Sequence, residues 1–438
     1  MGEVTLSQIL DARENRAKKQ KQLLTQYQKP LICFTMNIAG PTKLTPEIAK
    51  GFSFGSSMLL SRLAKASFVP LYIEEQLLPT GCEGYYIVDA PAEKIKALTV
   101  ALEEESSLGR LFDLDVLLPT GEKLERPTPR RCLICGETAA ICSRSRAHSV
   151  AQLQETTAAL LSQIPKAQHI GFLAQKALIL EVCCTPKPGL VDRDNSGSHR
   201  DMDIFTFFKS ITALGDYFEE CAKIGEETAT LPAKDTFQKL REAGIRAEQA
   251  MFAATVGVNT HKGAIFTLGL LCGSAGRLDS YDPDILCKEA AAMVQGIVSR
   301  ELAGVSEEAA TTAGQKLYRR YGITGVRGEA EQGFPSVLNI GLPALNQGLA
   351  QGLDLNDSGC AALLAILAHS EDTNLITRGS RETQLQLKNK LQSLLRSDPF
   401  PIRQVLQQLD EEFIQKNLSP GGSADLLAAC YFLQQLQF

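Results

Sequence analysis

The sequence predicts two domains, an α+β domain over residues 1–165 and an all-α helical bundle over residues 166–438. A chain of 438 residues is longer than one hydrophobic core commonly organises, so two domains are expected. Strand-like alternation is confined to the first part of the chain, whereas nearly every later segment has apolar residues at helical spacing. No linker rich in glycine, serine or proline separates the two parts, so we expect the domains to abut.

The composition excludes several classes of protein. The chain is 44% hydrophobic and 22% charged with a net charge of −5, which is typical of a globular protein without a basic surface for nucleic acid. No apolar run reaches the about 18–20 residues of a membrane span, and the polar N-terminus lacks the apolar core of a signal peptide. We therefore expect a cytoplasmic protein that binds neither nucleic acid nor membrane. The 12 cysteines are scattered and are expected to be reduced.

The expected elements of the first domain mix helices and strands. An amphipathic helix with a basic face over residues 5–24 precedes a strand at residues 31–36. A strand at residues 85–88, a helix opening at Pro91 and a strand over residues 110–118 follow. The turn after this last strand predicts a hairpin that returns through Leu124.

The strand over residues 110–118 holds the first chemical signal, because Asp113 and Asp115 are two residues apart. Side chains at this spacing point to the same face of a strand. Two such carboxylates repel each other unless a divalent cation lies between them, which is how many Mg²⁺-dependent phosphoryl and nucleotidyl transfer sites are made. The alternative is an exposed strand face on which acidic and apolar residues alternate.

Residues 130–148 combine possible metal ligands with a cluster of arginines. A Cys-x-x-Cys turn can place two thiolates on one zinc ion, but the third and fourth possible ligands are spaced less typically, so we expect reduced cysteines rather than zinc. Arginine binds phosphate oxygens through two N–H groups at once, so the cluster suits a substrate with several phosphates unless it is ordinary surface charge. The possible zinc ligands are Cys132, Cys135, Cys142 and His148, and the arginines are Arg130, Arg131, Arg144 and Arg146.

In the second domain, polar residues collect at the ends of apolar helices. An irregular, charged loop over residues 185–203 precedes a helix expected from Ile204 to Cys221, and buried helices are expected over residues 262–276 and 359–368. Helix N-termini offer backbone N–H groups to anions, and nearby carboxylates can hold Mg²⁺. Each cluster taken singly is more often a helix cap, as we expect for Ser423. The clusters occupy residues 259–263, 325–329, 369–374 and 419–425.

Both parts of the chain resemble known enzyme families. The first part resembles the holo-citrate lyase synthases, which are apo-citrate lyase phosphoribosyl-dephospho-coenzyme A transferases, and the second part resembles the triphosphoribosyl-dephospho-coenzyme A synthases. Together the matches cover essentially the whole chain and imply a fused, bifunctional protein. The first resemblance rests on residues 12–16, 109–116 and 131–148, and the second on Glu181 and residues 185–191, 195–203, 257–263, 327–329, 372–374 and 420–425.

The second resemblance implies that the helical domain joins ATP to 3′-dephospho-coenzyme A. The 2′-hydroxyl would attack the anomeric carbon of ATP's ribose and release adenine, with Mg²⁺ neutralising the triphosphate and either Glu181 or Asp203 as the catalytic base. The expected Mg²⁺ ligands are Asp201, Asp203, Asp372 and Asp425. The expected substrate-binding residues are Lys187, His199, Asn259, His261, Lys262 and Arg327.

The first resemblance implies that the α+β domain attaches the product to a carrier protein. A serine of the acyl carrier (γ) subunit of citrate lyase would attack the phosphate nearest the ribose and expel diphosphate. Asp113 and Asp115 would be catalytic and hold Mg²⁺, while Arg110, Arg144 and Arg146 would bind the polyphosphate. The reaction is nucleotidyl transfer in form and implies a nucleotidyltransferase-like sheet, although the only Gly-Ser pair before the aspartates, Gly55-Ser56, stands far upstream.

Three alternative functions are distinguishable by experiment. The same chemistry can serve the carrier of malonate decarboxylase, which would then be the carrier that is modified. A non-catalytic interaction protein stabilised by zinc would contain zinc and release no adenine. An ATP hydrolase would release adenine or phosphate without dephospho-coenzyme A.

Overall fold

The computed structural model describes residues 2–304, 310–395 and 402–437. The chain divides into two compact units between Pro165 and Lys166, here called the N-terminal unit and the helical unit, and each is described by itself. Among the described residues, no helix combines the length and the apolar character needed to cross a bilayer.

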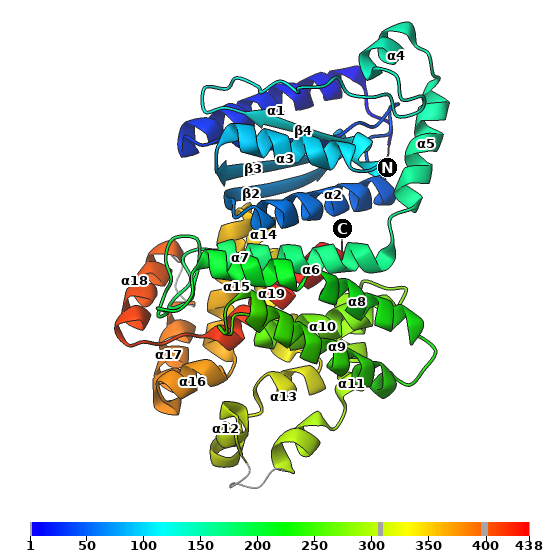
Figure 1. The fold of residues 1–438 in the computed structure, drawn as a ribbon. Coiled ribbons are helices and arrows are strands. Elements are labelled where there is room, and N and C mark those ends of the chain that lie inside the picture. Colours follow the sequence, from blue (N-terminus) through cyan, green and yellow to red (C-terminus); the bar gives the residue numbers. More distant parts are fainter. Residues whose placement is uncertain (1, 305–309, 396–401, 438) are drawn as a thin grey trace. The chain divides into compact units, whose positions relative to one another are not determined.

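The N-terminal unit is an antiparallel sheet of four strands in the order β2-β3-β1-β4, and helices lie around this sheet in Figure 1. This confirms the expected mixture of helices and strands. Its elements are α1 (Leu6–Tyr27), β1 (Leu31–Met36), α2 (Pro46–Lys65), β2 (Val69–Leu78), β3 (Gly81–Asp89), α3 (Ala92–Glu104), the 3-10 turn η1 (Leu108–Leu111), β4 (Phe112–Leu117), α4 (Ala139–Ser145) and α5 (Val150–Ser162).

The two faces of this sheet are covered by different helices. Cys33 of β1 packs with Leu23 and Leu24 of α1, whereas its neighbour Phe34 stacks on Phe52 of α2 with ring centroids 4.7 Å apart. Alternation along the strand therefore assigns α1 to one face and α2 to the other. In β4, Asp115 pairs with Cys33 and Asp113 with Thr35, so both aspartates belong to the face that α1 covers.

Helix α2 and strand β2 are among the elements of this unit that were not expected from the sequence. Helix α2 is buried at Gly51, Gly55 and Ser56 as well as at its apolar positions. Gly55 lies so close to the rings of Phe34 and Phe112 that a Cβ there would be 2.8 Å from them. A run of glycine and serine residues is typical of a loop in a sequence, so this helix was not expected. The expected hairpin after β4 is reduced to a turn and one isolated bridge, between Leu117 and Lys123.

The helical unit contains no β-strand among its described residues, which agrees with the all-α expectation. Its helices are α6 (Lys166–Cys183), α7 (Ile204–Ala213), α8 (Gly215–Glu227), α9 (Ala233–Ala254), α10 (Lys262–Arg277), α11 (Pro283–Val294), α12 (Ala313–Tyr321), α13 (Gly325–Glu331), α14 (Leu342–Ala350), α15 (Leu355–His369), α16 (Thr373–Arg378), α17 (Arg381–Leu394), α18 (Ile402–Gln415) and α19 (Gly421–Leu436), with π-helical segments η2 (Ser299–Ala303) and η3 (Val337–Gly341).

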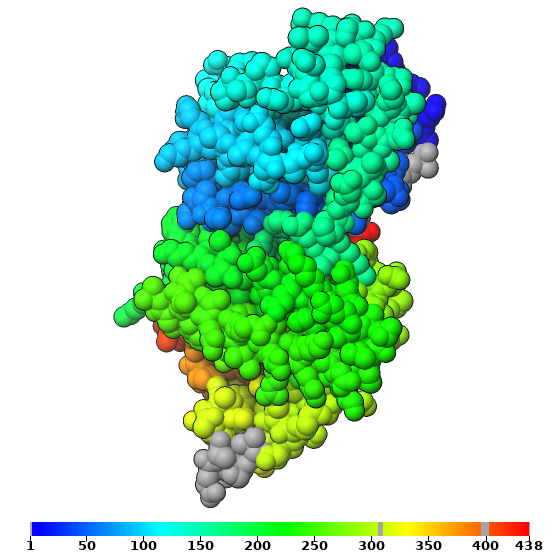
Figure 2. Space-filling view, turned by 45° about the vertical axis from the view of Figure 1, so that its right-hand side comes forward, coloured from blue at the N-terminus to red at the C-terminus, as the bar shows by residue number. Residues whose placement is uncertain are grey.

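The core of this unit is formed by α6, α10, α15 and α19, whose side chains are buried along most of their lengths, while α8 and α9 present an outer surface in the space-filling view (Figure 2). The buried helices expected at residues 262–276 and 359–368 are confirmed as α10 and α15. The single helix expected from Ile204 to Cys221 is wrong, because the chain breaks between α7 and α8 at Leu214. A Cβ at Gly215 would lie 1.9 Å from the side-chain nitrogen of Gln175, so the first residue of α8 lies directly against a side chain of α6.

Candidate functional site

A buried ion pair lies where α6 meets the loop over residues 185–203. Glu181 ends the buried face of α6 at 3% exposure, and Lys187, at 1% exposure, donates from Nζ to its Oε1. Burial raises the pKa of Glu181, and the charge of Lys187 opposes that rise. Two buried charges are stable only while each has its partner, so the pair holds the start of the loop against the helix.

The loop is tied down by two aspartates that the sequence analysis did not select. Asp192 accepts hydrogen bonds from the Thr185 hydroxyl (2.7 Å) and the Lys187 N–H (3.0 Å). Asp410 of α18 accepts one from the Gly189 N–H at 2.8 Å. These aspartates therefore hold the backbone of the loop in place. Asp410 is more than 200 residues away from the loop in the sequence, so the sequence did not predict its contact with Gly189.

Asp372 joins two helices. Its Oδ1 accepts from the backbone N–H groups of Asn374 (2.9 Å) and Leu375 (3.0 Å) and so caps α16. Its Oδ2 accepts from the Ser423 N–H (2.7 Å) and hydroxyl (2.9 Å) in α19. Four donors engage both oxygens of the carboxylate, which supports a structural role over the expected Mg²⁺ role. Ser423 lies inside α19, whose N-cap is Pro420, so the expectation that Ser423 is an N-cap is wrong.

Asp425 projects from α19 to the N-terminus of α10. The backbone N–H of Ala264 bonds to its carboxylate, and burial together with the nearby charges of Glu181 and Asp372 raises its pKa well above the ordinary value. Glu181, Asp372 and Asp425 are called the carboxylate cluster below. Within the described residues, Lys187 is the cation that pairs with this cluster, so the group carries an excess of negative charge when ionised.

Gly263 sets the position of Asp425, because a Cβ at Gly263 would lie 1.9 Å from Asp425 Oδ2. We expect Gly263→Ala to push the carboxylate away from α10 and to lower adenine release by about a hundredfold, since a shift of about 1 Å at a reacting centre has effects of this size. Gly314→Ala is the matched control, as a Cβ there meets no atom within 4 Å. Steady-state rates of adenine release from the two variants test this, and equal rates would contradict it.

His261 lies beside the same cluster with a neutral ring. Its Nδ1 is 2.7 Å from the Ser210 hydroxyl, and its ring meets Phe207 edge to face at 4.9 Å. Burial and the charge of Lys187 lower its pKa to about 3. Its Nε2 has no protein partner among the described residues. This buried nitrogen can therefore hydrogen-bond to a bound molecule, as the expected substrate-binding role requires.

Lys262 and Arg327 are brought together in one cavity of about 320 Å³ beside the start of α10. Lys262 pairs with Glu248 at 3.0 Å, and Arg327 donates from Nε to Glu301 at 2.8 Å. Asn259 Oδ1 accepts from the Lys262 N–H at 3.2 Å, at the start of α10. Gly263 also lines this cavity, so the cavity begins at the glycine that contacts Asp425.

His199, Asp201 and Asp203 lie at the far end of the loop. His199 Nε2 is 2.9 Å from the Ser419 hydroxyl at the start of α19, and its Nδ1 is 3.9 Å from the exposed Asp201. Asp203 caps α7 by accepting from the Thr206 N–H at 2.8 Å. In the part of the chain that the structure describes, no hydrogen bond or ion pair connects either aspartate with the carboxylate cluster, so their expected Mg²⁺ roles gain no support from the geometry.

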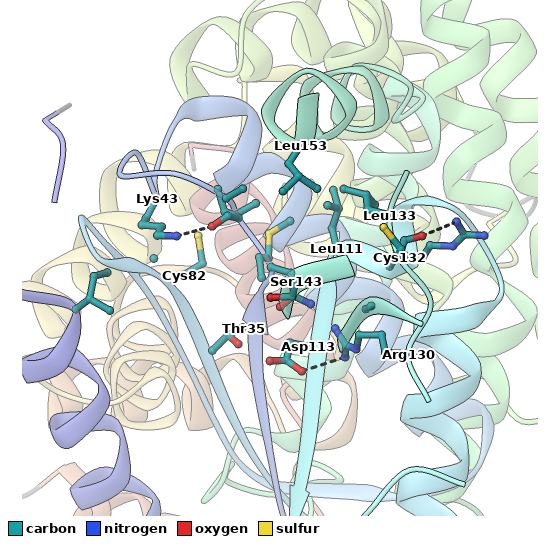
Figure 3. A pocket seen from close by; sticks show the side chains of 18 of the residues that line it. Thr35, Lys43, Cys82, Leu111, Asp113, Arg130, Cys132, Leu133, Ser143 and Leu153 are labelled. Atoms are coloured by element: carbon teal, nitrogen blue, oxygen red, sulfur yellow. Dashed lines mark hydrogen bonds and ion pairs between the residues drawn. The ribbon is translucent and has the colours of Figure 1, made fainter. Parts of the chain in front are cut away.

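The N-terminal unit has a cavity of about 590 Å³ at the end of β4 that faces α1. Asp113 points into it, and Arg130 donates to Asp113 Oδ1 at 3.0 Å, as Figure 3 shows. Seven basic side chains line this cavity together with that one carboxylate, which suits a polyanion. The basic residues are Arg13, Arg16, Lys43, Arg110, Arg130, Arg131 and Arg146.

The residues expected in this site divide into two groups. Asp113, Arg110 and Arg146 line the cavity, but Asp115 and Arg144 do not. Asp115 is bound to Lys123 at 2.7 Å. The sequence analysis gave no role to Arg13, Arg16 or Lys43, although the first two belong to the motif at residues 12–16 that carries the family resemblance.

The four possible zinc ligands also meet at this cavity. The sulfur and nitrogen atoms of Cys132, Cys135, Cys142 and His148 all lie within 4.8 Å of one another, and all but Cys135 line the cavity. Their irregular spacing in the sequence did not predict this convergence.

A basic cavity beside a carboxylate in one unit suits a phosphorylated substrate, and the other unit places a buried carboxylate cluster beside a helix N-terminus. The families that the two units match make the protein a transferase. Comparison with known families agrees for both units. Residues 4–164 match the family described as apo-citrate lyase phosphoribosyl-dephospho-CoA transferase, and residues 167–438 match ATP:dephospho-CoA triphosphoribosyl transferase.

Two relatives match this chain along both of its parts, and a third matches a large part of it. The protein is 36% identical to Protein CitXG of Haemophilus influenzae over 98% of this chain and 96% of the relative. It is 35% identical to Protein CitXG of Leuconostoc mesenteroides subsp. cremoris over 99% and 97%. The 2-(5''-triphosphoribosyl)-3'-dephosphocoenzyme-A synthase of Pectobacterium atrosepticum is 46% identical over 59% of this chain and 85% of the relative. The chain belongs to the family of fused enzymes that unite these two transferases.

Proposed function

We propose that the protein makes the prosthetic group of citrate lyase and attaches it to the enzyme's acyl carrier subunit. The helical unit, residues 166–438, would convert ATP and 3′-dephospho-coenzyme A into 2′-(5″-triphosphoribosyl)-3′-dephospho-coenzyme A and adenine. The N-terminal unit, residues 1–165, would transfer this product to a carrier serine and release diphosphate. The observation that carries the proposal is the match of the two families, in this order, along one chain whose fused relatives it covers almost end to end.

In the helical unit, the geometry favours Glu181 over Asp203 as the base. A bond forms between the 2′-oxygen and the anomeric carbon while the carbon–nitrogen bond to adenine breaks, and the hydroxyl proton must pass to a base. Burial raises the pKa of Glu181, which makes it the stronger base. Burial also raises the pKa of Asp203, but its bonds from Thr206 outweigh this and lower the pKa overall. Glu181 therefore accepts the proton, and Lys187 holds it in place.

The carboxylate cluster carries more negative charge than Lys187 balances, and this excess charge would attract a divalent cation. Asp425 is the best candidate ligand, since Asp372 is engaged by four donors. Bound Mg²⁺ would supply positive charge that neutralises the triphosphate. The neighbouring cavity would hold phosphates through Lys262 and Arg327, and His261 Nε2 would hydrogen-bond to the substrate. His199, Asn259, Asp201 and Asp203 stay in the proposal with support from the family resemblance alone.

The raised pKa of Asp425 predicts a pH-dependent stability. A group whose pKa is higher in the folded chain than in the unfolded one contributes stability at low pH, and that stability is lost as pH rises through the folded pKa. Without Mg²⁺, Asp425→Asn should therefore unfold at a higher temperature than the unaltered protein at neutral pH, and this difference should shrink on acidification. Thermal unfolding at several pH values measures it. Mg²⁺ should raise the unfolding temperature of the unaltered protein but not that of Asp425→Asn. An equal rise in the variant would exclude Asp425 as a ligand.

In the N-terminal unit, the arginines of the cavity would hold the triphosphate chain. Arg110 and Arg146 line the cavity as expected, and Arg13 and Arg131 extend the basic wall. An oxygen–phosphorus bond to the carrier serine forms while the bond to diphosphate breaks, and the serine proton needs an acceptor. Asp113 is the carboxylate placed to accept it. The geometry supports this base role more than a Mg²⁺ site shared with Asp115. The proposal of a nucleotidyltransferase-like sheet rests on the position of the two aspartates on one face of β4.

One incubation tests the first reaction. The full chain is mixed with ATP and 3′-dephospho-coenzyme A, and the products are separated by chromatography. Free adenine together with a heavier product that keeps the triphosphate is expected. Adenine or phosphate release that does not need dephospho-coenzyme A would instead show a hydrolase, and no release at all would contradict the proposal.

A second incubation tests the recipient. The reaction mixture is offered the apo-carrier of citrate lyase or that of malonate decarboxylase, and mass spectrometry measures the added group. Modification of the malonate carrier alone would overturn the assignment to citrate lyase. The expected cytoplasmic location belongs to this proposal, since both substrates and the carrier must meet the enzyme there.

A further inference from the structure

Four metal-binding side chains from separate parts of residues 130–148 meet at one point. Cys135 Sγ lies 3.4 Å from Cys142 Sγ and 3.3 Å from His148 Nε2, and the corresponding atom of Cys132 completes a set within 4.8 Å. Ligands of a tetrahedral zinc ion, with Zn–S of about 2.3 Å and Zn–N of about 2.0 Å, lie about 3.5–3.8 Å apart. The observed spacing is close to that of such a site.

The backbone around the first two cysteines is shaped to hold a thiolate. The N–H groups of Ile134 and Cys135 donate to Cys132 Sγ. Gly136 closes the turn at φ +76°, in the left-handed region that favours glycine. The Gly136 N–H also bonds to the Cys132 carbonyl at 3.3 Å. Since zinc binds the thiolate form, this turn prepares Cys132 for a metal.

The protein's other close cysteine pair lacks these features. Cys184 and Cys360 lie 3.6 Å apart, both buried. The hydrogen bond between these two free thiols, together with burial, raises the pKa of Cys360 well above the ordinary value. Among the described residues, neither cysteine lies in a group of three or more side chains that could bind a metal. Two close thiols occur both at Cys184 and Cys360 and at residues 130–148. A third thiol, a histidine and a turn that stabilises a thiolate are found beside them only at residues 130–148, among these two places.

We propose that Cys132, Cys135, Cys142 and His148 bind one Zn²⁺ ion. Four protein ligands complete a tetrahedral set, so the ion would be structural. The segment that it would hold carries Arg130, Arg131 and Arg146 of the polyanion cavity. Most residues between 130 and 148 are exposed or half-buried, and the segment lies at the surface in Figure 2. With little apolar core of its own, this segment would be ordered by the metal.

Metal analysis of the full chain, purified with a reductant and without added chelator, tests the proposal. One zinc per chain is expected, and Co²⁺ in its place should give the visible absorption of a tetrahedral thiolate site. Cys135→Ser with Cys142→Ser should lose the metal. Cys82→Ala is the matched control, since Cys82 lines the same cavity outside the cluster, and it should keep the metal. Zinc absent from the unaltered protein, or undiminished in the double variant, would overturn the site.

Thiol counting separates zinc from a disulfide between Cys135 and Cys142. The denatured protein should show all 12 cysteines as free thiols once zinc is removed, and two fewer would show a disulfide and overturn the site. These readouts are independent of the proposed reactions. Removal of zinc by a zinc-selective chelator, followed by assay in excess Mg²⁺, should also lower carrier loading at least about tenfold, as expected for misplaced binding residues, and leave adenine release unchanged. Unchanged loading after complete removal would overturn the role in ordering the cavity and leave the proposed function intact.

Discussion

Asp425→Asn is expected to lower adenine release by about a hundredfold or more while leaving the helical unit folded. The change keeps the shape of the side chain and removes the charge that would bind a cation and, through it, the triphosphate. Loss of one such electrostatic contribution in a water-excluded site lowers catalysis by about two to three orders of magnitude. The measurement is the initial rate of adenine release, with carrier loading from supplied intermediate as the internal reference, which should not change.

The stability of this variant distinguishes a functional role from a structural one. Asp425 is repelled by Glu181 and Asp372, so neutralising it should keep or raise the unfolding temperature without Mg²⁺. Asp284→Asn, at an exposed position in the first turn of α11, is the matched control for loss of one negative charge. A rate within threefold of the control, or lost activity with a lower unfolding temperature, would contradict the role proposed for Asp425.

Asp113→Asn is expected to abolish carrier loading and to leave adenine release intact. Asp113 lines the polyanion cavity and lies within 3.0 Å of Arg130, and asparagine cannot accept the serine proton. General-base removal lowers rates by about two to four orders of magnitude. Loading is followed by mass spectrometry of the carrier with the intermediate supplied, so that the result does not depend on the helical unit.

The neighbouring aspartate provides the control for this experiment. Asp115→Asn should lower loading by no more than a few-fold, because Asp115 lies outside the cavity and binds Lys123 near the surface. Equal loss in both variants would instead support a cation held by the pair. Loss of adenine release in Asp113→Asn would mean that the two reactions do not have independent sites.

Much of the architecture follows from local patterns that the sequence states directly. Strand β1 and helices α10 and α15 were expected at nearly their observed positions, because uninterrupted apolar patterning and clear end signals specify them. Helix α2 was missed because its buried glycines and serines give no apolar helix pattern. The close approach of Gly55 to Phe34 and Phe112 depends on residues distant in the chain. The break at Leu214 was missed because it depends on the approach of Gln175 to Gly215.

The candidate sites show the same division. The sequence placed Asp372 and Asp425 among equivalent carboxylates, yet Asp372 is engaged by four donors and Asp425 faces the start of α10. Asp113 and Asp115 share one face of β4, but only the end of the strand at Asp113 opens into the cavity. Spacing along a chain cannot show which neighbours reach a carboxylate, because those neighbours come from helices and loops far away in sequence.

Motifs and hydrophobic patterns in the chain were therefore sufficient to assign the family and the two kinds of unit, since these are local properties. The partners of each charged group could be assigned only after folding. Glu181 became a buried base candidate through Lys187, and Asp425 a ligand candidate through Gly263. Four residues with unpromising spacing were brought within 4.8 Å of one another by the path of residues 130–148. Long-range packing sets the charge and solvent around each group, and these govern its chemistry.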